Sequence, residues 1–178
     1  MWILVVPVAS YAQSYTPVDS KDAVIFSIKN FGVNVTGSFH SLNGTVKFDS
    51  EQPEQASFDV SIPVSTLQTG IDLRDKHLQK KDYFDVKSFP NIYFTSTSVK
   101  PGKNTGEFKV TGTLTIKGKP EEVTFPFSVT YKPDGTLVFV GSFTINRRNF
   151  GIGGWSVSLA DAVLIKLSVH VESIEADH

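Results

Sequence analysis

Apolar and polar residues alternate strictly along four stretches in the second half of the chain. These stretches cover residues 108–116, 123–130, 137–146 and 163–172. Successive side chains of a β-strand point to opposite faces of a sheet, so a period of two predicts strands with one buried and one exposed face. Each stretch is therefore predicted to be a long, half-buried strand.

Shorter stretches with the same period precede them. They cover residues 15–18, 23–30, 33–39, 42–48, 56–63 and 91–99. We expect the third and fourth of these to form a hairpin that bends around His40 and Ser41. Closely spaced strands without a long helical pattern between them favour antiparallel up-and-down connections. The pattern thus predicts an all-β fold, a single antiparallel barrel of about eight strands.

One segment, residues 69–81, departs from the period of two. Thr69 followed three residues later by Asp72 resembles a helix capping box, and the spacing of Ile71 and Leu78 places them on one helical face. We expect one short helix here, covering one mouth of the barrel.

Three features favour a hollow barrel. The late strands, at 11–14 residues and roughly 3.3 Å per residue, would be about 36–46 Å long, against about 17–20 Å for an ordinary strand. Gly112 and Gly141 fall at inward positions, where a glycine leaves room for another group or permits the bend that closure needs. Phenylalanine is frequent at inward positions, which suits either a lined tube or a packed core.

Composition narrows the partners and the compartment. The chain has 178 residues, no cysteine, a formal net charge of −1 and a pI near 6.4. These values fit one domain and give no basic footprint for nucleic acid. The apolar run 2–9, followed by Ser10, Tyr11 and Ala12, resembles an export signal cleaved before Gln13, although no basic residue precedes it.

The expected organisation is therefore a signal peptide at residues 1–12 and one barrel domain at 13–178, periplasmic or secreted. The alternative for the N-terminus is a buried strand. No stretch reaches the roughly 20 apolar residues that a membrane-spanning helix needs, so the protein is not expected to span a membrane.

Several short motifs occur along the chain in a characteristic order. They are Thr69-Gly70, Arg74-Asp75, His77-Leu78, residues 82–85, Phe89-Pro90 and 92–94, then Val35 with 37–39, 112–118, and Arg147 with 150–152. Together they resemble the YceI-like family of polyisoprenoid-binding, lipocalin-like proteins. Asn149 departs from the family pattern, which has an acidic residue there.

The resemblance implies an eight-stranded barrel, commonly exported, that binds an amphipathic lipid such as a polyisoprenoid, an isoprenoid quinone or a fatty acid or its amide. It implies a carrier and not an enzyme. We expect apolar side chains to line the lumen. These are Phe26, Ile28, Phe48, Phe58, Phe94, Phe108, Leu114, Phe125, Phe127, Phe139, Phe143 and Phe150.

Polar residues at the mouth are expected to hold the lipid head group. The candidates are Arg74 and His77 near the helix, and Arg147 or Arg148 from a late loop, through charge-assisted hydrogen bonds. No cofactor is expected. No metal site is expected either, because Asp75 and His77 lack a third ligand.

Two other functions are compatible with the sequence. One is a small hydrolase or isomerase acting on such lipids, with His77 and Asp75 as acid and base. The other is a structural module with a solid core. Dimerisation through an outer barrel face is also open.

Overall fold

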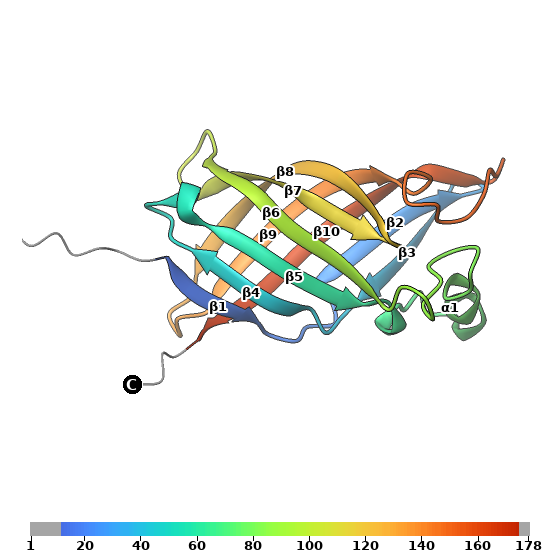
Figure 1. Cartoon of the computed structure of the whole chain (residues 1–178), viewed down its shortest axis with the longest axis horizontal. Coiled ribbons are helices and arrows are strands. Elements are labelled where there is room, and N and C mark those ends of the chain that lie inside the picture. Colours follow the sequence, from blue (N-terminus) through green and yellow to red (C-terminus); the bar gives the residue numbers. More distant parts are fainter. Residues whose placement is uncertain (1–11, 175–178) are drawn as a thin grey trace, which may run out of the picture.

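The computed structural model describes residues 12–174. It contains ten strands, one α-helix and two short 3₁₀ helices (Figure 1). The strands are β1 (Gln13–Pro17), β2 (Val24–Asn30), β3 (Val33–Phe39), β4 (Asn43–Phe48), β5 (Ser57–Pro63), β6 (Asn91–Pro101), β7 (Glu107–Ile116), β8 (Lys119–Tyr131), β9 (Leu137–Asn146) and β10 (Leu159–Ser173). The helices are η1 (Pro53–Gln55), η2 (Val64–Thr66) and α1 (Asp72–Leu78).

Eight of the strands close into an antiparallel barrel. Strands β4 to β10 pair in sequence order, and β1 joins β4 to β10 and so completes the ring. Strand β10 is long enough to pair with β1 near its end and with β2 near its start, so the β2–β3 hairpin extends the wall beyond the ring. The expected eight-stranded barrel with one short helix is confirmed, with β2 and β3 lying outside the ring.

The predicted hairpin of residues 33–39 and 42–48 is wrong. Strand β3 pairs with β2 along its whole length, whereas β4 pairs with β1 and β5. The turn between β2 and β3 consists of Phe31 and Gly32, both with positive φ (49° and 76°), as a two-residue type I′ turn requires. A phenylalanine in this conformation is uncommon, so the sequence carried no usable signal for the turn.

The barrel has two unlike ends (Figure 1). We call the end with the β4–β5, β6–β7 and β8–β9 connections the closed end. The end with α1, the β2–β3 and β7–β8 turns and the β9–β10 loop is the mouth end. Buried side chains form one cluster near each end. Within residues 12–174, no helix is long and apolar enough to cross a bilayer.

Residues 1–11 lie outside the described part of the chain. The predicted signal peptide therefore falls almost entirely outside it, and the prediction of export stays untested.

Candidate ligand-binding cavity

A cavity of about 300 Å³ lies inside the barrel. Strands β2 to β10 all contribute side chains to its wall, and residues of α1 and of the segment after it cover part of its mouth. Ligand sites in proteins span roughly 300–1,000 Å³, so the cavity is at the lower end of that range. Most of its lining is apolar, while Asn30, Thr69, Arg74 and Arg147 place polar groups near the mouth.

Packed phenylalanines fill the closed end. The Phe48 ring makes edge-on contacts with Phe108 and Phe139, with ring centroids 5.1 and 5.3 Å apart. Phe58 and Phe127 meet edge-on at 5.6 Å, and both of them border the cavity together with Phe139. We call these five residues the phenylalanine plug. The lumen is consequently hollow towards the mouth and solid at the other end, and is not open along its whole length.

Most of the residues predicted to bind the ligand line this cavity. They are Phe26, Ile28, Phe58, Arg74, Phe94, Leu114, Phe125, Phe127, Phe139, Phe143 and Arg147.

Four predicted residues lie elsewhere. Phe48 and Phe108 belong to the plug behind the cavity floor, and Phe150, a residue of the β9–β10 loop, is buried in the mouth-end cluster. His77 is exposed on α1, where its ring lies 4.9 Å from that of Tyr83. For the phenylalanines the period of two gave the inward face correctly, but not the depth along the barrel.

The two inward glycines differ in what they accommodate. A Cβ on Gly112 would lie 2.6 Å from the Phe94 ring and 2.6 Å from the Thr95 carbonyl oxygen, so this glycine leaves room for a neighbouring ring and not for a ligand. Gly141 lines the cavity, and a Cβ there would lie 3.0 Å from the Pro126 carbonyl oxygen.

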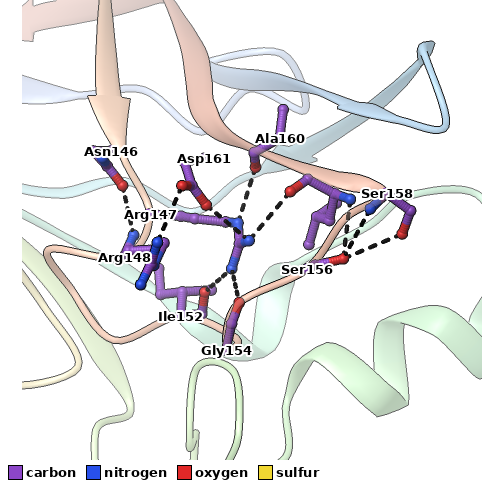
Figure 2. A network of polar contacts seen from close by, with 10 residues as sticks. Asn146, Arg147, Arg148, Ile152, Gly154, Ser156, Ser158, Ala160 and Asp161 are labelled. Atoms are coloured by element: carbon purple, nitrogen blue, oxygen red, sulfur yellow. Dashed lines mark hydrogen bonds and ion pairs between the residues drawn. The ribbon is translucent and has the colours of Figure 1, made fainter.

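Arg147 is buried at the mouth end and holds the β9–β10 loop (Figure 2). All five N–H groups of its guanidinium have a partner. The acceptors are the carbonyl oxygens of Ile152 (2.8 Å), Gly154 (3.0 Å), Leu159 (3.3 Å) and Ala160 (2.9 Å) and the carboxylate of Asp161 (3.0 Å).

This network changes the role expected of Arg147. Arg147 was predicted to bind the head group of the lipid, yet none of its side-chain N–H groups remains free to donate to a ligand. Its side chain borders the cavity and fixes the loop above it. The half-exposed Arg148 side chain makes a 3.5 Å ion pair with Asp161.

Arg74 and Asp75 anchor the chain before α1. The Thr69 amide donates to the Asp75 carboxylate at 3.0 and 3.2 Å, and the Thr69 hydroxyl donates to the same carboxylate. Arg74 donates from Nε to the Thr69 hydroxyl and from Nη2 to its carbonyl oxygen, both at 2.7 Å. The predicted capping box is wrong, because the residue preceding α1 is Ile71 and Thr69 bonds to Asp75 instead of capping the helix.

Two polar groups at the cavity keep unused hydrogen-bonding capacity. Within residues 12–174, Arg74 Nη1 has no hydrogen-bond partner. The side-chain oxygen of Asn30 is buried without a partner in the same part of the chain. Buried polar atoms normally have partners, so an unpaired one beside a cavity marks a place where a ligand would be held. Sequence reasoning missed Asn30, because a single asparagine at a strand end carries no signal of its own.

The mouth is framed by hydrogen bonds between segments distant in sequence. Ser38 and Gln68 exchange two backbone hydrogen bonds, which join β3 to the segment before α1. Further hydrogen bonds connect the other segments. The Gly153 amide donates to the Asp82 carbonyl oxygen (2.8 Å), and the Phe31 amide donates to the Ser158 carbonyl oxygen (2.8 Å). Lys117 Nζ donates to the carbonyl oxygens of Lys81 (2.7 Å) and Gly151 (2.9 Å). We call this ring of connected segments the mouth frame.

The positions of Asp75 and His77 do not favour the alternative in which they act as the acid and base of an enzyme. The Asp75 carboxylate is bonded to Thr69, and His77 contacts Tyr83 on the outer side of α1. No group of three metal-ligating side chains occurs in the described part of the chain. Burial raises the pKa of Tyr15, and hydrogen bonds from Thr136 lower the pKa of Asp134, but neither residue lines the cavity.

The chain is similar in sequence and in structure to several known proteins. A UPF0312 protein of Pseudomonas fluorescens is 34% identical over 140 residues, 72% of this chain and 70% of the relative. The crystal structure of BcnA from Burkholderia cenocepacia is 31% identical with a TM-score of 0.77, covering 88% of this chain and 94% of BcnA.

A polyisoprenoid binding domain from Saccharophagus degradans shares the fold at 16% identity, with a TM-score of 0.68 over 93% of this chain and all of that domain. The model of the YceI-like domain matches residues 15–171. This chain therefore belongs to the YceI-like domain family.

Proposed function

We propose that the protein binds and carries an elongated amphipathic lipid, with the apolar chain inside the barrel and the polar end at the mouth. The observation that carries the proposal is the apolar cavity, which a phenylalanine plug closes at one end. A site of this shape accepts a narrow hydrocarbon and excludes water from it. The polyisoprenoid binding domain of Saccharophagus degradans, which shares the fold, supports this class of ligand.

Hydrophobic transfer supplies the binding energy. Each buried methylene contributes about 0.8 kcal/mol, so a dozen contribute about 10 kcal/mol. Association costs on the order of 4–15 kcal/mol. The apolar chain alone then contributes at most about 6 kcal/mol net, which keeps binding reversible, as a carrier needs.

The polar end of the ligand is assigned to Arg74 and Asn30. Arg74 Nη1 offers unused N–H donors, and the Asn30 amide offers an unused acceptor beside the same cavity. A hydroxyl or an N–H-bearing amide, which can both accept and donate, would satisfy both kinds of group, whereas a carboxylate would bond only to Arg74. We propose that the barrel acts in the periplasm or outside the cell, after removal of the apolar N-terminal segment.

Filling the cavity tests the proposal. Val163 points into the cavity, and its neighbour Leu164 points outward from the same strand. Val163→Phe should weaken binding of cis-parinaric acid and geranylgeraniol at least tenfold, about 1.4 kcal/mol, because the ring occupies the ligand's space. Native mass spectrometry and fluorescence titration would measure this.

Leu164→Phe is the matched control and should bind like the wild type. The proposal fails if the wild type neither copurifies with a lipid nor takes up either probe. Equal binding by Val163→Phe and the wild type would also contradict it.

A further inference from the structure

The most exposed large apolar side chains gather at the mouth end. Five of them are 67–86% exposed, whereas every other large hydrophobic residue in the described range is at most 55% exposed. We call these five the apolar rim. They are Phe31 and Val33 in and after the β2–β3 turn, Leu73 on α1, and Trp155 and Val157 in the β9–β10 loop.

The rim is presented by a fixed structure. The β2–β3 turn and the β9–β10 loop belong to the mouth frame, α1 lies between two of its segments, and all three lie at the same end of the barrel (Figure 1). The Phe31 amide bonds to the Ser158 carbonyl oxygen, next to Val157, and the Arg147 network holds the loop that carries Trp155. These side chains are thus kept in solvent by the backbone and do not fold back onto the barrel.

Charge is distributed unevenly between the mouth end and the rest. Residues 29–36, 69–90, 116–122 and 146–161, which form the mouth end, contain ten Lys and Arg against seven Asp and Glu. The whole chain has 17 basic and 18 acidic residues, so the remainder carries an acidic excess. The end of the barrel that carries the rim therefore has a net excess of positive charge, ten basic against seven acidic residues.

We propose that the mouth end docks on the surface of a lipid bilayer that contains anionic lipids, with the rim entering the interfacial region. Tryptophan and phenylalanine favour that region, and basic residues beside them are attracted to anionic head groups. The cavity opens at the same end, so a docked barrel faces the membrane from which a lipid would enter. The biological purpose of docking rests on the proposed carrier function, but the contact itself does not.

Vesicle binding tests the contact directly. The chain has two tryptophans, Trp2 and Trp155, so a Trp2→Phe variant reports on Trp155 alone. Its emission should shift to the blue with vesicles of phosphatidylcholine and phosphatidylglycerol, and brominated lipids should quench it. Vesicles of phosphatidylcholine alone should bind more weakly, and added salt should weaken binding to the mixed vesicles.

Replacing two of the five rim side chains by polar ones should weaken this binding strongly. Leu73→Ser with Val157→Ser should lower partitioning to the mixed vesicles at least tenfold without unfolding the protein, because both side chains are at least 80% exposed. Tyr131→Ser with Ile174→Ser, which removes exposed apolar groups at the closed end, is the matched control and should bind normally.

Uptake of cis-parinaric acid in the absence of vesicles separates the two proposals, because neither rim substitution lines the cavity. Vesicle binding without uptake would refute the carrier and leave docking intact. Uptake without vesicle binding would refute docking. Equal loss in both double variants would also refute it, as would a dimer that the rim substitutions dissociate, since a second copy would then cover the rim.

Discussion

Arg147 is a buried charge that is completely paired. A guanidinium removed from water is stable only when all its donors find acceptors, and here four carbonyl oxygens and one carboxylate provide them. Two of these bonds satisfy the carbonyl groups of Ile152 and Gly154 in the β9–β10 loop, which has no regular secondary structure, and two satisfy carbonyl groups at the start of β10. The Arg147 side chain thus supplies the β9–β10 connection with hydrogen bonds that neighbouring strands would supply in a sheet.

Replacing Arg147 should therefore be costly. Arg147→Met leaves four carbonyl groups without their partner and Asp161 with only its 3.5 Å ion pair to Arg148, and we expect the free energy of unfolding to fall by roughly 3–5 kcal/mol. Urea denaturation followed by circular dichroism measures the loss. Arg148→Met, which removes only the half-exposed neighbour, should change stability by no more than about 1 kcal/mol. Similar losses in both variants would contradict this account.

The residues of the candidate site were predictable to different extents. Phe26 and Phe143 followed from strand periodicity, because inward position is a local property of the sequence. The hydrogen bonds of the Arg147 guanidinium could not be predicted in this way. Four of its five acceptors are backbone carbonyl groups, which any residue at those positions would carry.

At the scale of elements, α1 is stabilised from outside. It has seven residues, fewer than an isolated helix needs in water, and no side chain caps its start. Asp75 and Arg74 instead bond back to Thr69. The helix and the loop before it therefore form one unit over the mouth.

Asp75→Ala should loosen this unit. A hydrogen bond to a charged group contributes about 1.5–3 kcal/mol, so amide exchange at Thr69 should accelerate tenfold or more in a hydrogen–deuterium measurement. Asp72→Ala removes an exposed carboxylate from the same helix and should leave exchange at Thr69 unchanged. Unchanged exchange in the Asp75 variant would show that the bonds carry no local stability.

Strand positions were largely predictable, but strand partners were not. Alternation in 33–39 and 42–48 located both strands correctly, because it depends on neighbours in sequence. Pairing depends on the turn, and the β2–β3 turn uses a phenylalanine with positive φ that no propensity favours. The hairpin was for this reason assigned to the wrong pair.

At the scale of the whole molecule, the phenylalanine plug sets the depth of the lumen. Phe139 contributes to both parts, because its ring packs against Phe48 and also lines the cavity. Periodicity could not predict where the filled part ends, since inward rings have the same spacing in a plug and in a lining.

Shortening Phe139 should deepen the cavity. Phe139→Ala should lower the free energy of unfolding by about 3–5 kcal/mol and move the preferred ligand to a longer chain, measured with a series of fatty acids. Phe108→Ala removes a ring from the plug that does not border the cavity, so it should destabilise the protein without changing chain-length preference. The same preference in both variants would contradict a depth set by the plug.

Because the lumen is closed at one end, it has a single entrance and cannot act as a channel. A bound lipid must leave through the same opening by which it entered. An incoming lipid therefore cannot displace it from the opposite side. Turnover would then depend on how fast the occupant departs and not on how abundant its replacement is.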